Sequence, residues 1–325
     1  MRRPMADDPL EKLRVGVSAC LLGQKVRFDG GHKRHDFTAD VLAPFVEFVA
    51  VCPEIEIGLG VPRPTIRLEG RARTPRLVNP ASGDDLTEAM TTYARARLAE
   101  LAGAGLDGYI LKRASPSCGM ERVKLYPARG VPPNKEGVGL FAAALMARFP
   151  ALPVEEEGRL GDPALRENFV ERLFAHRRVR RLFAGRWTVD DLVRFHTAEK
   201  LLLMAHDIAR YRGLGRLVAS ARRVERGGLA ARYVEMYMGA LAVRATRRKN
   251  TNVLQHMAGY FKVSLDQDDR AELHRAIADY HRGWVPLIVP ITLLRHHARR
   301  QGVTYLLGQR YLEPHPRELM LRNHV

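Results

Sequence analysis

Three apolar segments in the first half of the chain are typical of β-strands, and each is followed by one of the chain's three cysteines. The segments are 15–19, 45–51 and 108–111, and the cysteines are Cys20, Cys52 and Cys118. A helical pattern over 86–103 lies between the second and third segments, with acidic residues in its first turn and a glycine at its end. Strands that alternate with helices predict a parallel sheet, whose strands end at one shared edge. The three cysteines are therefore expected to meet at that edge.

The cysteine spacing matches no zinc ribbon, no thioredoxin pair and no ferredoxin run. Three cysteines cannot form a fully paired disulfide framework, and so few in 325 residues indicate a reducing compartment, the cytoplasm. Three thiolates leave one position open on a tetrahedral zinc ion or on a four-iron cluster, which is where a substrate can bind. The alternative is that all three are small buried apolar side chains.

The residues around the cysteines carry a resemblance to a known family. The three blocks are SACLLG with the following VRFDGGHK, VCPEIEIG, and KRASPSCG, in this order. Together they resemble the TudS-like thiouracil desulfidases over about the first 160 residues. The resemblance implies that Cys20, Cys52 and Cys118 hold a [4Fe-4S] cluster with one iron free of protein ligands. It also implies that Glu56 is the catalytic acid or base and that Ser115 is its partner hydroxyl.

Two carboxylates near Cys52 are candidates for this chemistry. Glu54 and Glu56 alternate with isoleucines, so both point to one side if the segment is extended. Glu54 and Ser117 form the second candidate pair, although a serine beside a proline also commonly stabilises a turn. Lys112, at the end of its strand, is expected either to balance the charge of thiolates and sulfide or to be an ordinary surface lysine.

The second half differs in charge and in pattern. Residues 1–160 carry a net charge of +3, and residues 161–325 carry +14. Asp266 and Thr188 are good helix N-caps, and Leu273, Ile277, Tyr280 and Trp284 share one face of the helix that follows Asp266, so an all-helical domain is predicted. The segment from about residue 168 to 319 resembles the YbgA-type helical domain that is often fused to the desulfidase domain, as in RudS-type tRNA 4-thiouridine desulfidases.

A strongly basic domain is the electrostatic signature of a phosphate-backbone partner, so tRNA is the expected partner. The basic runs supply the candidate RNA contacts, whose alternative is a solvated helix face. These candidates are Arg247, Arg248, Lys249, Arg178 and Arg181.

The predicted organisation is an α/β domain with a Rossmann-like parallel sheet over 1–160, followed by an all-α domain over 161–325. The segment 149–161, rich in proline and glutamate, is the candidate boundary, with a packed active-site loop as the alternative. No targeting segment and no membrane-spanning segment are expected, because the longest apolar stretch, 285–294, is short and contains two prolines.

The expected function is iron-sulfur-dependent, non-redox conversion of 4-thiouridine in tRNA, and also of a free thiolated pyrimidine, to the uracil form with release of sulfide. One alternative is a non-catalytic RNA-binding protein with a structural three-cysteine metal site. The other is a tRNA sulfur-insertion enzyme, which the lack of a nucleotide-binding G-x-x-x-x-G-K-[ST] motif disfavours.

Overall fold

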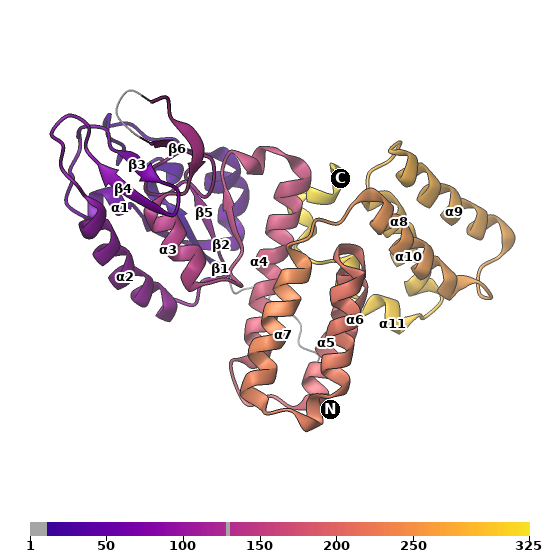
Figure 1. Ribbon diagram of the computed structural model, residues 1–325. Coiled ribbons are helices and arrows are strands. Elements are labelled where there is room, and N and C mark those ends of the chain that lie inside the picture. The colour runs from indigo at the N-terminus through magenta and orange to yellow at the C-terminus, as the bar shows by residue number, and fades with distance from the viewer. Residues whose placement is uncertain (1–11, 128–130) are drawn as a thin grey trace. The chain divides into compact units, whose positions relative to one another are not determined.

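The computed structural model describes residues 12–127 and 131–325. The chain divides into two compact units, Met1–Gly161 and Asp162–Val325, and each is described here by itself (Figure 1). The first is an α/β unit and the second is helical, as the sequence predicts. Among the described residues, no helix combines the length and the apolar character that crossing a bilayer requires.

A four-stranded parallel sheet forms the frame of the first unit. Its strands are β1 (Leu13–Ser18), β2 (Val46–Val51), β5 (Gly108–Leu111) and β8 (Val154–Glu156), in the order β2-β1-β5-β8. Ser18 pairs with Val51, and Leu111 pairs with Glu156, so the strands end at one edge. The prediction of a parallel sheet from the first three strands is confirmed.

Strand β8 lies inside the candidate boundary segment 149–161. Glu155 and Glu156 lie on this buried strand, Glu157 directly follows it, and the division between the units follows Gly161. Because these residues are charged, the sequence did not indicate a buried strand here.

A second, mixed sheet was not predicted. Its strands are β3 (Arg67–Arg71), β4 (Thr74–Val78), β6 (Val123–Tyr126) and β7 (Asn134–Gly137), in the order β4-β3-β6-β7. These strands are four or five residues long and rich in charged side chains, so neither length nor alternation marks them in the sequence.

Helices α2 (Thr87–Gly103) and α3 (Leu140–Arg148) pack against each other and bury the aromatic core of this unit. Tyr109 of β5 lies across Gly16 of β1, where an added Cβ atom would come within 2.2 Å of the tyrosine ring. Gly16 is thus required for the close approach of this ring to the sheet.

The second unit consists of helices with few irregular segments. Helices α4 to α7 pack along one another, and α8 to α11 form a second group (Figure 1). Their bounds are α4 Pro163–Phe183, α5 Val189–His206, α6 Ile208–Ala219, α7 Arg226–Leu241, α8 Arg247–Ala258, α9 Gln267–Arg282, α10 Ile288–Arg300 and α11 Thr304–Leu307.

The helix starts in this unit follow the predicted caps. The Thr188 side chain accepts from the Asp191 backbone N–H in a capping box, and Asp266 accepts from the Asp269 backbone N–H. The placement of Trp284 on the helix face of Leu273, Ile277 and Tyr280 is wrong. Gly283 adopts the left-handed conformation and ends the helix, so Trp284 lies outside it with 72% of its surface exposed.

Candidate active site and basic surfaces

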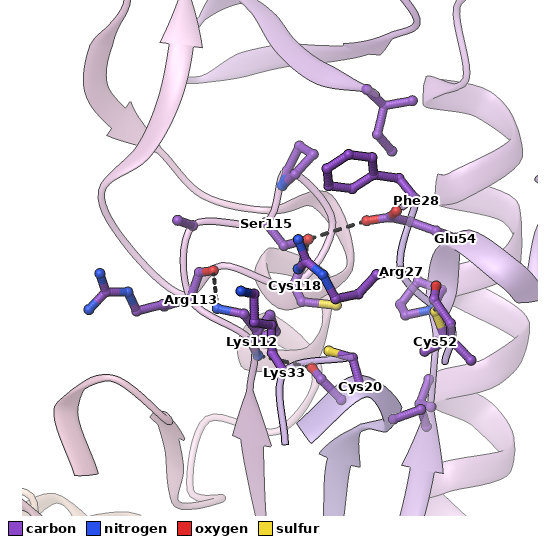
Figure 2. A pocket seen from close by; sticks show the side chains of 18 of the residues that line it. Cys20, Arg27, Phe28, Lys33, Cys52, Glu54, Lys112, Arg113, Ser115 and Cys118 are labelled. Atoms are coloured by element: carbon purple, nitrogen blue, oxygen red, sulfur yellow. Dashed lines mark hydrogen bonds between the residues drawn. The ribbon is translucent and has the colours of Figure 1, made fainter. Parts of the chain in front are cut away.

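A pocket of about 410 Å³ lies at the edge of the parallel sheet where its strands end, and all three cysteines line it. Cys20 lies in the 3₁₀ turn Ala19–Leu22 after β1, and Cys52 directly follows β2. Cys118 lies in the loop after β5. Figure 2 shows the three side chains around the same hollow, so three segments far apart in sequence converge as the strand pattern predicts.

The loop that carries Cys118 is held by backbone contacts. The Ser115 hydroxyl oxygen accepts from the backbone N–H groups of Ser117 (3.2 Å) and Cys118 (3.1 Å). A Cβ atom added to Gly139 would lie 2.5 Å from the Ser117 carbonyl, so the α3 N-terminus packs tightly under this loop. The position of Cys118 is therefore fixed by the fold rather than by a bound group.

The thiols lie in a poorly solvated environment. Burial raises the pKa of Cys20 to about 11, although nearby Lys112 opposes this shift. Burial also raises the pKa of Cys52 and, more strongly, that of Cys118. At neutral pH these groups are thiols until a cation replaces their protons, as soft metal centres do.

The donor set fits an iron-sulfur cluster. Each thiolate of a cubane cluster binds a different iron, so the three sulfur atoms need to surround a cavity rather than meet at one point. Among the described residues, no three His, Cys, Asp or Glu side chains are placed to hold a single metal ion. Three cysteine sulfur atoms around one pocket that Lys112 also lines suit the larger group.

Glu54 is the carboxylate that lines the pocket. The Arg63 guanidinium donates to Glu54 Oε2 from both Nε (3.2 Å) and Nη2 (2.6 Å), and the Ser115 hydroxyl donates to Glu54 Oε1 (3.3 Å). The Arg63 side chain is only 4% exposed, and it also donates to the carbonyls of Gly60 and Val26. Glu54 is thus held from both sides and cannot rotate freely.

Glu56 does not line the pocket. Residues Pro53–Glu56 form the short helix α1 instead of the expected extended segment, because Pro53 occupies its first position. Two residues in a helix are rotated by about 200°, so Glu54 and Glu56 diverge. Glu56 accepts hydrogen bonds from the Cys52 backbone N–H (3.0 Å) and the Tyr93 hydroxyl (2.7 Å), which stabilises the turn that carries Cys52. The pairing of Glu56 with Ser115 is therefore corrected to Glu54 with Ser115.

The remaining candidates near the pocket have different positions. Lys112 lines it, and its ammonium group pairs with Glu157 at 2.5 Å. Ser117 is fully buried outside the lining, and its hydroxyl has no hydrogen-bond partner among the described residues.

Three functional candidates were missed in the sequence. Arg63 lies nine residues from Glu54, and Glu157 lies 45 residues from Lys112, so only the tertiary fold reveals these pairs. Phe28 lines the pocket with 38% of its surface exposed, and the Arg27 guanidinium carbon lies 5.2 Å from its ring centroid. The one signal in the sequence for Phe28 was its place in the block of residues that follows Cys20.

The predicted RNA contacts divide into buried and exposed residues. Arg178 is buried, pairs with Glu199 (2.7 Å) and donates to the Pro314 carbonyl, so its assignment as an RNA contact is wrong. Its guanidinium stabilises the helical core. Arg181 is half-buried and engaged in interactions within the fold.

The basic run at the start of α8 is more accessible. The Lys249 ammonium donates to the His206 carbonyl (2.6 Å) and is half-buried. Arg247 and Arg248 are exposed and are the accessible members of the predicted set.

Comparisons with known proteins divide at the same place as the two units. Residues 15–157 match the family model of 2-thiouracil desulfurase, and residues 200–316 match that of a protein of unknown function, DUF1722. The uncharacterized protein YbgA of Escherichia coli K12 is 33% identical over 153 residues, which are 47% of this chain and 90% of that protein. The uncharacterized protein YbbK of Bacillus subtilis 168 is 33% identical over 109 residues, which are 32% of this chain and 71% of that protein.

A solved structure also matches. It is that of a [4Fe-4S]-dependent thiouracil desulfidase, TudS, which is 34% identical and superposes with a TM-score of 0.40. The match covers 49% of this chain and all of that one.

Proposed function

Because the chain belongs to the 2-thiouracil desulfurase family through residues 15–157 and continues in a YbgA-like domain, we propose that it is a desulfidase of thiolated pyrimidines. The observation that carries the proposal is one pocket that contains three cysteines and a fixed glutamate–serine pair. The reaction replaces sulfur by oxygen without net redox change. A ring C=S group and water give a ring C=O group and hydrogen sulfide.

In this proposal Cys20, Cys52 and Cys118 hold a [4Fe-4S] cluster. When bound, such a cluster supplies a Lewis-acidic iron without a protein ligand, which is suited to a soft sulfur atom.

The residues of the chain perform the proton transfer. Glu54 lies on the pocket wall and accepts a proton from the attacking water, as a general base does. Arg63 and Ser115 act as positioning residues, because they hold the two carboxylate oxygens. Oε2 accepts two bonds from Arg63, whereas Oε1 accepts only the bond from Ser115, so the second lone pair of Oε1 leaves Glu54 able to accept the proton.

Phe28 and Lys112 complete the pocket. The Phe28 ring offers an apolar surface on which a pyrimidine can stack. The Lys112 ammonium, which donates to the Arg113 carbonyl (3.0 Å, Figure 2), interacts electrostatically with Cys20 and offers positive charge near the departing sulfide.

We further propose that the substrate pyrimidine is 4-thiouridine in tRNA and that the helical unit binds the RNA. The net charge of +14 over residues 161–325 supports this partner. The target base must leave its stack in the tRNA before it can enter the pocket. This unstacking costs roughly a few kcal/mol, which the free energy of RNA binding must offset.

The test is an anaerobic incubation of the iron-loaded full chain with 4-thiouracil, 4-thiouridine and thiolated tRNA. We expect loss of the thiocarbonyl absorbance together with an equal amount of sulfide. Added salt should weaken tRNA binding and so slow the reaction on tRNA. The logarithm of the binding constant should fall against the logarithm of the salt concentration with a slope of roughly −0.9 per neutralised phosphate on duplex regions, and turnover of the free base should be unaffected. Intact thiocarbonyl absorbance in all three substrates would refute the proposed activity.

A further inference from the structure

One aromatic side chain of the helical unit is exposed on a basic surface. Trp284 follows the end of α9 with 72% of its surface exposed, and among the large apolar side chains of residues 12–127 and 131–325 only Val263 is more exposed. Burying an indole ring is among the largest apolar gains available to a chain. An indole left outside the core is therefore a candidate contact for a partner.

Arg282 lies against the Trp284 ring, Arg247 lies beside the preceding Gly283, and Arg248 follows Arg247 in α8; we call these four residues the Trp284 surface. The Arg282 guanidinium carbon lies 4.8 Å from the Trp284 ring centroid, and Arg282 pairs with Asp279 at 3.2 Å. A guanidinium nitrogen of Arg247 lies 2.7 Å from the place where Gly283 would carry a Cβ atom. Arg248 follows Arg247 and is exposed.

Arg247 and Arg248 occupy an unfavourable place for cations. They are the first two residues of α8, the positive end of the helix dipole, and the first turn contains no acidic residue. A cation at this end typically costs a few tenths of a kcal/mol up to about 1 kcal/mol. A bound anion removes the cost, because it interacts favourably with both guanidinium groups and with the positive end of the helix dipole.

The surface lies on a rigid base. The Asn250 side chain of α8 donates to the Tyr280 hydroxyl of α9 (3.2 Å) and accepts from the Tyr311 hydroxyl (3.0 Å). The Arg247 guanidinium lies 5.9 Å from the Tyr280 ring centroid. Helices α8 and α9 pack against each other, so the arginines of one helix and the indole after the other keep a fixed spacing (Figure 1).

We propose that the Trp284 surface binds an unpaired nucleotide of RNA, with the base stacked on the indole ring and the adjacent phosphates on Arg247 and Arg248. Aromatic stacking accepts any unstacked base, and arginines pair with phosphates. Bases within a helix are already stacked, so the surface selects a single-stranded loop or end. The choice of RNA rests on the proposed function, whereas the stacking arrangement rests on these four residues.

The test uses the fluorescence of the full chain. The sequence contains two tryptophans, so Trp187→Phe leaves Trp284 as the sole indole emitter. A single-stranded oligouridylate is titrated into this protein, and an RNA duplex of equal charge and inorganic polyphosphate serve as controls. We expect stacking to quench the emission with oligouridylate only.

A second series of variants, made in the wild-type background, measures the affinity for oligouridylate. Trp284→Ala should weaken oligouridylate binding about tenfold, from the usual contribution of one base–aromatic stack, and Trp284→Phe should restore most of it. Val263→Ala, at the most exposed large apolar side chain of the part of the chain that the structure describes, is the control and should change nothing.

The outcomes separate this inference from the proposed function. Unchanged emission with oligouridylate, equal quenching by duplex or polyphosphate, or equal affinity of Trp284→Ala and the wild type would each overturn the stacking role. Turnover of free 4-thiouracil should be the same in Trp284→Ala and the wild type. A wild-type chain without turnover that still shows quenching would refute the desulfidase and leave the RNA contact standing.

Discussion

Replacing Glu54 with glutamine, beside the matched change Glu56→Gln, tests which carboxylate performs the chemistry. Glu54→Gln keeps the shape, and its amide oxygen can replace Oε2 as the acceptor for Arg63, but it removes the basic oxygen Oε1. A positioned general base typically contributes about 10²–10⁴-fold, so we expect turnover of free 4-thiouracil to fall at least about 100-fold.

The cost in stability is limited by the other partners of Arg63. Removing one member of a buried ion pair typically costs about 3–5 kcal/mol. Arg63 also donates to the carbonyls of Gly60 (2.8 Å) and Val26 (3.0 Å), and the amide oxygen of glutamine still accepts, so we expect about 1–2 kcal/mol. Typical domains are stable by about 5–15 kcal/mol, so the variant should remain folded and load iron.

Glu56→Gln is the control of equal size. The Glu56 side chain is 32% exposed and lies 3.5 Å from Arg97, a partly exposed pair of the kind that contributes about 0–1 kcal/mol. Glu56 does not line the pocket, so we expect the activation free energy to change by no more than about 1 kcal/mol. Since about 1.4 kcal/mol corresponds to a tenfold change in rate, turnover should stay within about fivefold of the wild type. Iron content and denaturant midpoints are measured on both variants. An active Glu54→Gln with a normal iron content, or an inactive Glu56→Gln that is folded and loaded, would refute the assignment.

Three further predictions concern the fold. The pKa of Cys20 is about 11 in the folded cluster-free chain, against an ordinary value of 9.0, so the folded state holds its proton longer than the unfolded one. The free energy of unfolding should therefore be highest below about pH 9 and decline toward pH 11. Denaturant titrations of Cys20→Ala should show a smaller decline over this range. An equal decline in the variant would contradict Cys20 as its cause. Arg178→Ala leaves Glu199 buried without its partner and should cost about 3–5 kcal/mol, measured by urea unfolding, whereas a loss under 1 kcal/mol would indicate an ordinary surface arginine. Gly16→Ala places a methyl group against the Tyr109 ring and should lower the free energy of unfolding through overpacking, typically by about 1–3 kcal/mol. The melting temperature should fall accordingly, and an unchanged melting temperature would contradict this packing.

The parts of the fold that local physics determines were predictable. The strands before the cysteines are mainly apolar runs of the kind that a parallel sheet buries, and the caps at Thr188 and Asp266 satisfy helix N–H groups within three residues. The convergence of Cys20, Cys52 and Cys118 then follows from the rule that parallel strands end at one edge.

The parts set by tertiary pairing were not predictable. Whether Glu54 or Glu56 faces the pocket depended on a single turn of helix, and an extended segment would have aligned both. Arg178 and Arg248 look alike in the sequence, and only the packing of α4 against α5 shows that the first is paired with Glu199 inside the core. The short charged strands of the second sheet gain their stability from neighbours far along the chain.

The most direct measurement of the proposed centre is Mössbauer spectroscopy of the full chain loaded with ⁵⁷Fe, before and after anaerobic addition of 4-thiouracil. Three cysteine ligands leave one iron of four chemically distinct, so substrate should shift about a quarter of the iron signal and leave the rest unchanged. Cys20→Ser, Cys52→Ser and Cys118→Ser should each lose iron or this distinct site. A spectrum in which substrate shifts none of the iron, or a full and unchanged iron content in any of the three variants, would contradict a three-cysteine cluster with an open iron.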